Sequence, residues 1–143
     1  MPEVKDTSDR FVAAFNAHDQ HALDALHAHD IKFNAPGGFK ATNAKDATAY
    51  AMTWLKAFPD GKMKVRSEII SGPWVVQELV MEGTHTAPLE SPTGTIPATY
   101  KKVVSYGVQL LRVENAKIAE ARIYFDQLDL MTQLGLIPTP ATV

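Results

Sequence analysis

The second half of the chain is a run of β-rich segments, and this run limits what the chain can fold into. Four segments between residues 63 and 125 are rich in β-branched and aromatic residues. Turn-forming residues separate them, at Gly72-Pro73, Pro92-Thr93-Gly94 and Glu114-Asn115-Ala116. Segments of this length joined by short turns predict antiparallel hairpins. One face of such a sheet must be buried, so other elements have to cover it.

The first half of the chain supplies helices that can cover the sheet. Apolar residues at helical spacing, with capping residues before them, predict three helices and a strand between the second and third. The expected starts are Thr7 or Ser8, Asp19 and near Asn43 for the helices, and Ile31 to Ala35 for the strand. A last short helix near residues 128–134 is predicted to end at Gly135, which suits the left-handed position after a helix.

The pattern predicts one α+β domain over residues 1–143. Its expected form is a cone-shaped, strongly curved antiparallel sheet covered by about three N-terminal helices, with a short C-terminal helix. A chain of 143 residues is one domain in length. It buries about 68–70% of its unfolded surface, which allows a core and a modest internal cavity. Helices covering a curved sheet leave a cone with an open mouth, where we expect the pocket.

Composition and charge exclude several classes of protein. The net charge is −2 and no basic tract stands out, so we expect no nucleic-acid partner. The absence of cysteine excludes disulfides, thiolate nucleophiles and cysteine-bound zinc. The first ten residues are polar, unlike a signal peptide, and no segment approaches the roughly 20 apolar residues that span a bilayer. We therefore expect a full-length cytoplasmic protein with no membrane partner.

Several short stretches occur in an order that is similar to a known family. They are Asn16–Asp19, Ala57–Asp60, Glu82–Thr86, Pro92–Gly94, Lys117–Glu120, Tyr124–Asp126 and Gln133–Gly135. In this order the chain, from about Asp9 to Leu136, resembles the SnoaL-like polyketide cyclases, or ester cyclases, of the ketosteroid-isomerase-like superfamily. The resemblance implies the conical fold, a homodimer and an acid/base aspartate at the end of the last long strand, here Asp126. The family usually has glycine where this chain has Ala116, before the last strand.

Asp126 is the main catalytic candidate, and two interpretations of it are open. In an apolar pocket, burial would raise the pKa of its carboxyl towards working pH, and it could then take a proton from a carbon beside a carbonyl. Directly before the final helix, the same carboxylate could instead cap free backbone amides, which would keep it ionised. The resemblance favours the pocket interpretation.

Further side chains are candidates for binding the substrate and stabilising an enolate. Along the last strand, Arg122, Tyr124 and Asp126 fall on one face, either towards a pocket or towards solvent. The substrate-binding candidates are His85, Tyr124, Arg122, Trp54, Tyr106 and Asn34. For each a simpler role is open: a surface ion pair with Glu120 for Arg122, packing for His85, core positions for Trp54 and Tyr106, and exposure for Asn34.

Two other features are weighed for function. His18 and His21 have a spacing that could share a metal ion, but no acidic pattern follows, so we predict no metal and no cofactor. The segment 87–99, with three prolines and a glycine, could close over a pocket mouth. An ordinary hairpin connection is the preferred interpretation of that segment.

We predict a cofactor-free cyclase or isomerase that acts on a small apolar carbonyl compound, polyketide- or steroid-like, by proton abstraction. One alternative is a non-catalytic domain that binds a small ligand or serves as a dimeric partner. Another is an epoxide hydrolase of the limonene type, in which Arg122 would lie between two acids that hold a water. The second acid would then have to come from Glu78, Glu82 or Glu68.

Overall fold

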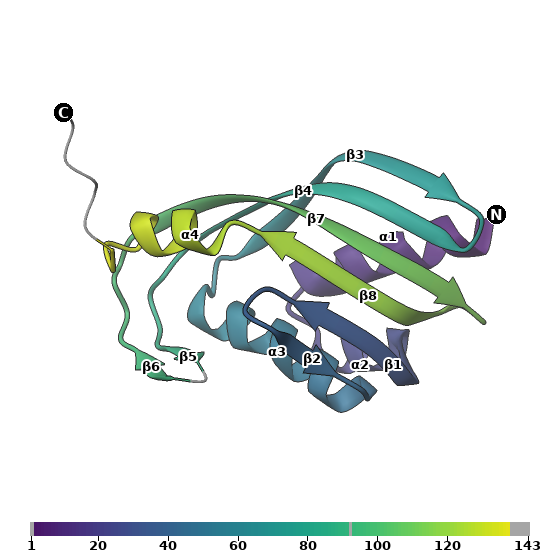
Figure 1. Cartoon of the computed structure of the whole chain (residues 1–143), viewed down its shortest axis with the longest axis horizontal. Helices are drawn as coiled ribbons and strands as arrows, with labels where there is room; N and C mark the ends of the chain where they lie inside the picture. The colour runs from purple at the N-terminus through teal and green to yellow at the C-terminus, as the bar shows by residue number, and fades with distance from the viewer. Residues whose placement is uncertain (1, 92, 138–143) are drawn as a thin grey trace.

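The computed structural model describes residues 2–91 and 93–137, which form four helices, a large sheet and a small one (Figure 1). The elements in chain order are α1 (Pro2–Asn16), α2 (Gln20–Leu26), β1 (His27–Ala35), β2 (Phe39–Ala41), α3 (Ala44–Ala57), β3 (Lys62–Ser71), β4 (Trp74–Thr84), β5 (Leu89–Ser91), β6 (Gly94–Ile96), β7 (Lys102–Glu114), β8 (Lys117–Phe125) and α4 (Gln127–Gln133). The predicted α+β class is confirmed. None of these helices combines the length and apolar character needed to cross a bilayer.

The large sheet has six strands in the order β2-β1-β8-β7-β4-β3. The pairs are antiparallel except β1 with β8, which is parallel, so the sheet is mixed and not purely antiparallel as predicted. Tight turns join β3 to β4 and β7 to β8 and make these pairs antiparallel, whereas β1 is far from β8 in sequence and no turn constrains its direction. Irregularities in register interrupt the β3–β4, β7–β8 and β1–β8 pairs, and such bulges bend and twist a sheet.

Three helices cover one face of the sheet and leave the other face open. In Figure 1, α1, α2 and α3 lie behind the strands. Along β7 every second residue from Val103 to Val113 is buried, which is the alternation expected of a half-covered sheet. The main core joins the helices to the covered face through Leu23, Ile31, Leu55, Leu79, Leu111 and Ile118. Burying each such side chain contributes about 1.5–3 kcal/mol.

The helix boundaries follow local chemistry, with one correction. Asn43 caps α3 as predicted, because its side-chain oxygen accepts from the Asp46 amide at 2.9 Å. Gly135 adopts a φ of 75° after α4, also as predicted. The prediction that Thr7 or Ser8 starts the first helix is wrong, because α1 begins at Pro2 and both side chains are buried within it. Proline is accepted in a first helical turn, where its missing amide is not needed.

The turn between β7 and β8 is a tight two-residue connection. Asn115 has a φ of 54° and Ala116 a φ of 58°, both in the left-handed region. Two such residues make the turn type that matches the twist of paired strands. The turn therefore keeps the geometry that glycine would favour, even though alanine occupies one of its positions. The amide of Ala116 donates to the carboxylate of Glu3, which ties the turn to α1.

Candidate functional site

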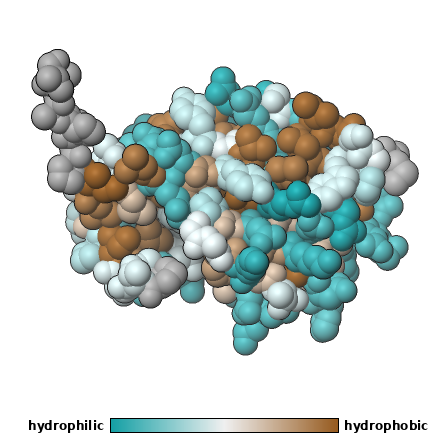
Figure 2. Space-filling model, viewed as in Figure 1, coloured by the Kyte–Doolittle hydropathy of each residue, from teal (hydrophilic) through white to brown (hydrophobic). Residues whose placement is uncertain are grey.

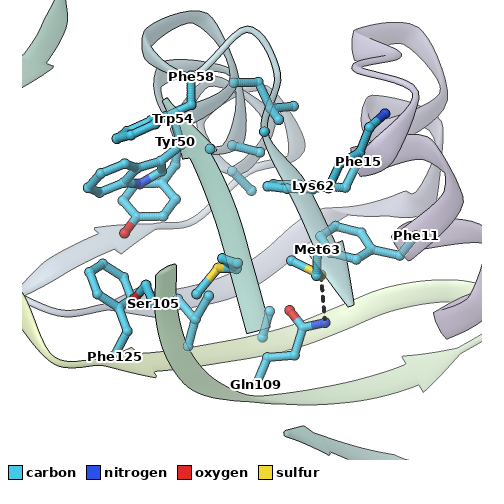
Figure 3. Close-up of a pocket in the computed structure, with 18 of the residues that line it drawn as sticks. Phe11, Phe15, Tyr50, Trp54, Phe58, Lys62, Met63, Ser105, Gln109 and Phe125 are labelled. Carbon is cyan, nitrogen blue, oxygen red and sulfur yellow. Dashed lines mark hydrogen bonds between the residues drawn. The ribbon is translucent and has the colours of Figure 1, made fainter. Parts of the chain in front are cut away.

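An apolar cavity lies between the covered face of the sheet and the helices. It offers about 120 Å³ to the centres of water molecules, far above the roughly 10–15 Å³ that one water requires. Figure 3 shows part of its wall, in which several aromatic side chains face the cavity. The aromatic lining residues are Phe11, Phe15, Phe33, Tyr50, Trp54, Phe58 and Phe125. A cavity with this lining suits a small apolar molecule with aromatic or ring character.

Helical spacing places three of these aromatic side chains. Tyr50, Trp54 and Phe58 follow one another at intervals of four along α3 and its C-cap, so their rings share one face. The ring centroids of Tyr50 and Trp54 lie 6.2 Å apart, and those of Trp54 and Phe58 6.4 Å. Phe125 at the end of β8 meets Trp54 edge-on at 5.7 Å. Trp54, one of the predicted substrate-binding residues, therefore lines the cavity.

Two polar groups in the cavity can orient a ligand. Gln109 of β7 donates its amide hydrogens to the Gln77 oxygen at 2.8 Å and to the Met63 sulfur at 3.9 Å, the second of which Figure 3 draws as a dashed line. Its carbonyl oxygen is left as an acceptor. Gln77 in turn donates to Glu68 at 2.8 Å, which fixes the direction of the chain of amides. Burial raises the pKa of the Tyr50 hydroxyl, so the phenol stays protonated and can donate. These two side chains therefore offer a hydrogen-bond acceptor and a hydrogen-bond donor within a largely apolar wall.

The cavity also contains an imidazole that the sequence did not single out for chemistry. His27 is buried at the start of β1, and its Nδ1 lies 2.9 Å from the Thr48 hydroxyl. Burial lowers the pKa of His27 to about 4, against the opposing effect of the Asp24 carboxylate, so the ring is neutral near pH 7. In sequence His27 is one of several histidines around a helix end. Only its position between a helix and an apolar strand could have distinguished it.

Asp126 lies outside the cavity. Its side chain is exposed, and its Oδ1 accepts from the Asp129 amide at 2.9 Å as the N-cap of α4. The adjacent Phe125 and the following Leu130 line the cavity, but Asp126 does not. The predicted placement of this carboxyl in an apolar pocket is wrong, because the unpaired amides of the first turn of α4 hold it. The capping interpretation describes this structure.

Four predicted binding residues lie on the open face of the sheet. Tyr106 is 57% exposed and Tyr124 56%. Arg122 borders the cavity wall, but its guanidinium bonds Glu120 at 2.9 Å and stacks over the Trp74 ring at 5.1 Å. Asn34 pairs in register with Arg122 and so shares its face. The period of two in the strands sends Ala121, Ile123 and Phe125 into the cavity and the intervening polar row away from it.

His85 is buried behind the cavity wall and not on it. Its Nδ1 accepts from the Thr99 amide at 3.2 Å, and its ring packs against Phe58 with centroids 5.3 Å apart. Burial lowers the pKa of His85, and its Nε2 is a buried atom without a partner among the described residues. The ring therefore anchors the segment that follows β4 to the segment between β6 and β7, and His85 is a packed residue as its simpler interpretation held.

The candidate metal pair does not form a site. Within residues 2–91 and 93–137, no group of three or more histidine, cysteine or acidic side chains lies close enough to share a metal ion. His18, one of the pair, instead bonds the carbonyl oxygen of Gly61 at 2.9 Å.

Comparison with known proteins gives the family. A sequence profile described as SnoaL-like polyketide cyclase matches residues 5–134, most of the chain. The chain belongs to the SnoaL-like polyketide cyclase family. As a family member it is similar to the aklanonic acid methyl ester cyclase DauD of Streptomyces sp. (strain C5), at 31% identity over 90% of this chain and 73% of that protein.

Two further similarities agree with this assignment. The aklanonic acid methyl ester cyclase DnrD of Streptomyces peucetius is 35% identical over 66% of this chain, and the match spans 65% of DnrD, just under two thirds of its length. The crystal structure of AclR from Streptomyces galilaeus superposes with a TM-score of 0.82 at 24% identity, covering 99% of this chain and 86% of AclR. The latter likeness establishes the fold, which the sequence resemblance had implied.

Proposed function

We propose that this chain closes a ring in a small polyketide-like carbonyl compound held in the aromatic cavity, without a metal or organic cofactor. The observation that carries the proposal is the cavity itself, with many aromatic side chains in its wall, a hydrogen-bond acceptor at Gln109 and a hydrogen-bond donor at Tyr50. An intramolecular aldol closure moves one proton from a carbon to a new alkoxide oxygen. It needs an apolar site, a proton acceptor and a donor for the enolate oxygen.

The test uses the substrate named for the two curated relatives, aklanonic acid methyl ester. We expect the protein to convert it to a cyclised isomer of unchanged mass, followed by chromatography and mass spectrometry, at a rate that a chelator does not change. Binding without any cyclised isomer would overturn the proposal in favour of a non-catalytic ligand-binding domain. Dependence of the rate on an added metal ion would overturn the cofactor-free part alone.

The epoxide hydrolase alternative has less support in the geometry. Glu120 is contacted by both Arg122, at 2.9 Å, and Arg112, at 3.6 Å. This is one acid between two arginines on the open face, whereas that chemistry needs an arginine between two acids inside the pocket. We expect no oxygen from labelled water in the product. Incorporation of one labelled oxygen would instead favour hydrolysis.

The open face of the sheet supports a homodimer as part of the proposal. Figure 2 looks onto this face and shows apolar side chains gathered over β3 and β4. Ile69 there is 65% exposed, and Tyr106 and Tyr124 on the neighbouring strands are more than half exposed. A second copy packed on this face would bury them. Sedimentation should give the mass of two chains for the wild type and one chain for Tyr106→Glu, whereas Tyr100→Glu, in the segment between β6 and β7, should stay dimeric. A monomeric wild type would contradict this.

A further inference from the structure

Three side chains form a hydrogen-bonded row from the cavity to the surface. His27 lines the cavity, and its Nδ1 lies 2.9 Å from Oγ1 of Thr48, a residue of α3 that is 2% exposed. The same Oγ1 lies 3.2 Å from Oδ1 of Asp24, an exposed residue of α2. On the outside, Asp24 and Thr48 line a polar depression together with Gln20, His21 and Lys45. The row therefore connects an apolar interior to water.

The row fixes which nitrogen of His27 carries the proton. A hydroxyl has a single hydrogen, and a carboxylate is a stronger acceptor than a neutral imidazole nitrogen. Thr48 therefore donates to Asp24, and its oxygen accepts a hydrogen from Nδ1 of His27. The remaining ring nitrogen, Nε2, is then unprotonated, with its lone pair available. No hydrogen bond to Nε2 is found among the described residues.

We propose that His27 Nε2 is the proton acceptor of the cavity and that Thr48 and Asp24 act through it as positioning residues. The inference rests on the proposed function, because a proton acceptor is useful only if a carbonyl compound occupies the cavity. Burial keeps the ring neutral near pH 7, so the lone pair is free when the ligand arrives. The Asp24 carboxylate then stabilises the positive ring that forms, in spite of the apolar surroundings.

Every proton that moves in this step is accounted for. A carbon–hydrogen bond beside the carbonyl breaks, its electron pair stays on the substrate as an enolate, and the proton binds Nε2. The hydrogen on Nδ1 can move to Thr48 Oγ1 while the hydroxyl hydrogen of Thr48 moves to Asp24. On ring closure the new alkoxide takes the proton from Nε2 and the row returns to its first state. No oxidant or reductant is involved.

The experiment measures hydrogen–deuterium exchange at the carbon beside the carbonyl of 2-tetralone in D2O, by NMR, with the full chain. The wild type should accelerate exchange, and His27→Gln should lower the catalysed exchange rate by about 100-fold or more, which is the contribution typical of a general base. Thr48→Val should lose part of the rate, and Thr48→Ser should restore it. His29→Gln, on the exposed part of β1, is the matched control and should exchange as the wild type does.

A second measurement keeps the proposal testable if a variant fails to fold. Nitrogen-15 shifts of wild-type His27 should report a protonated Nδ1 and an unprotonated Nε2. The proposal would be overturned if the shifts reported the opposite tautomer of His27. It would also be overturned if folded His27→Gln catalysed exchange at the wild-type rate, or if the wild type did not accelerate exchange at all. Cyclisation that persists in His27→Gln would remove His27 but leave the proposed function intact. Exchange that depends on His27, without cyclisation of aklanonic acid methyl ester, would support His27 as the proton acceptor and overturn the proposed ring closure.

Discussion

Two ionisable side chains lie where their surroundings in the sequence do not indicate. Asp126, predicted to lie in the pocket, is outside it, whereas His27, which no pattern singled out, lines the cavity. Asp126 stands where both a pocket acid and a helix cap are plausible, and the pattern alone does not decide between them. The structure decides for the cap, because the amide of Asp129 lies within hydrogen-bond distance. His27 gives no comparable signal, since its partner Thr48 is 21 residues away and meets it only after the helices have packed. A burial-driven pKa depends on that packing and cannot be predicted from spacing.

The role of Asp126 can be tested by two substitutions that separate capping from proton transfer. Asparagine caps a helix about as well as aspartate but cannot act as a base. We expect Asp126→Asn to keep both stability and turnover, and Asp126→Ala to lose about 1 kcal/mol of unfolding free energy. Urea unfolding and the cyclisation assay check this. Loss of turnover in a stable Asp126→Asn protein would restore the pocket interpretation.

Burial of His27 predicts a pH dependence of stability. The unfolded ring takes up a proton near pH 6.5 and the folded ring only near pH 4, so stability falls as the pH is lowered between these values. The full difference is roughly 3 kcal/mol. His85, whose pKa burial also lowers, adds a fall of the same sign. Urea unfolding between pH 7 and 5 should show a shallower fall in His27→Gln and an unchanged one in His29→Gln. An equally steep fall in His27→Gln would refute the burial.

The helices and hairpins were largely predictable because each carries its own boundary residues. Asn43, Gly135 and the turn at Asn115-Ala116 mark ends that the structure reproduces. What could not be predicted was set by long-range pairing. The parallel pairing of β1 with β8 joins segments about 90 residues apart, and no local residue specifies its direction. The start of α1 was misplaced because Thr7 and Ser8, good capping residues, are buried inside a helix that begins earlier.

The turn between β7 and β8 offers a stabilising substitution. Ala116 holds a φ of 58°, which costs a residue with a Cβ atom roughly 1–2 kcal/mol. Ala116→Gly should remove most of that strain, and part of the gain is lost to the greater freedom of glycine in the unfolded chain. We expect a net rise of about 1 kcal/mol in unfolding free energy, measured in urea. Ala121→Gly, at a regularly paired position of β8 opposite Leu111, should lower the unfolding free energy. A change of the same sign in both variants would contradict the strain at Ala116.

The large sheet has one face covered by helices and one open face, and each side of the molecule has one tryptophan. Trp54 lines the cavity from α3, whereas Trp74 lies on the open face beneath Arg122. The six-stranded sheet is predictable in kind from the β-rich segments. Which polar side chains face the cavity could not be predicted, because this depends on which of the two faces of the sheet the helices cover. The prediction for Arg122, Tyr124, Tyr106 and Asn34 chose the wrong face for this reason.

The most direct test of the cavity as the ligand site uses the indole N–H signals of these two tryptophans. The chain has no other tryptophan, so two indole signals are expected, assigned by Trp54→Phe and Trp74→Phe. Titration with 2-tetralone should shift the Trp54 signal in a saturable manner and leave the Trp74 signal in place. A saturable shift of the Trp74 signal alone, or no saturable shift of either signal, would contradict the cavity as the site of ligand binding.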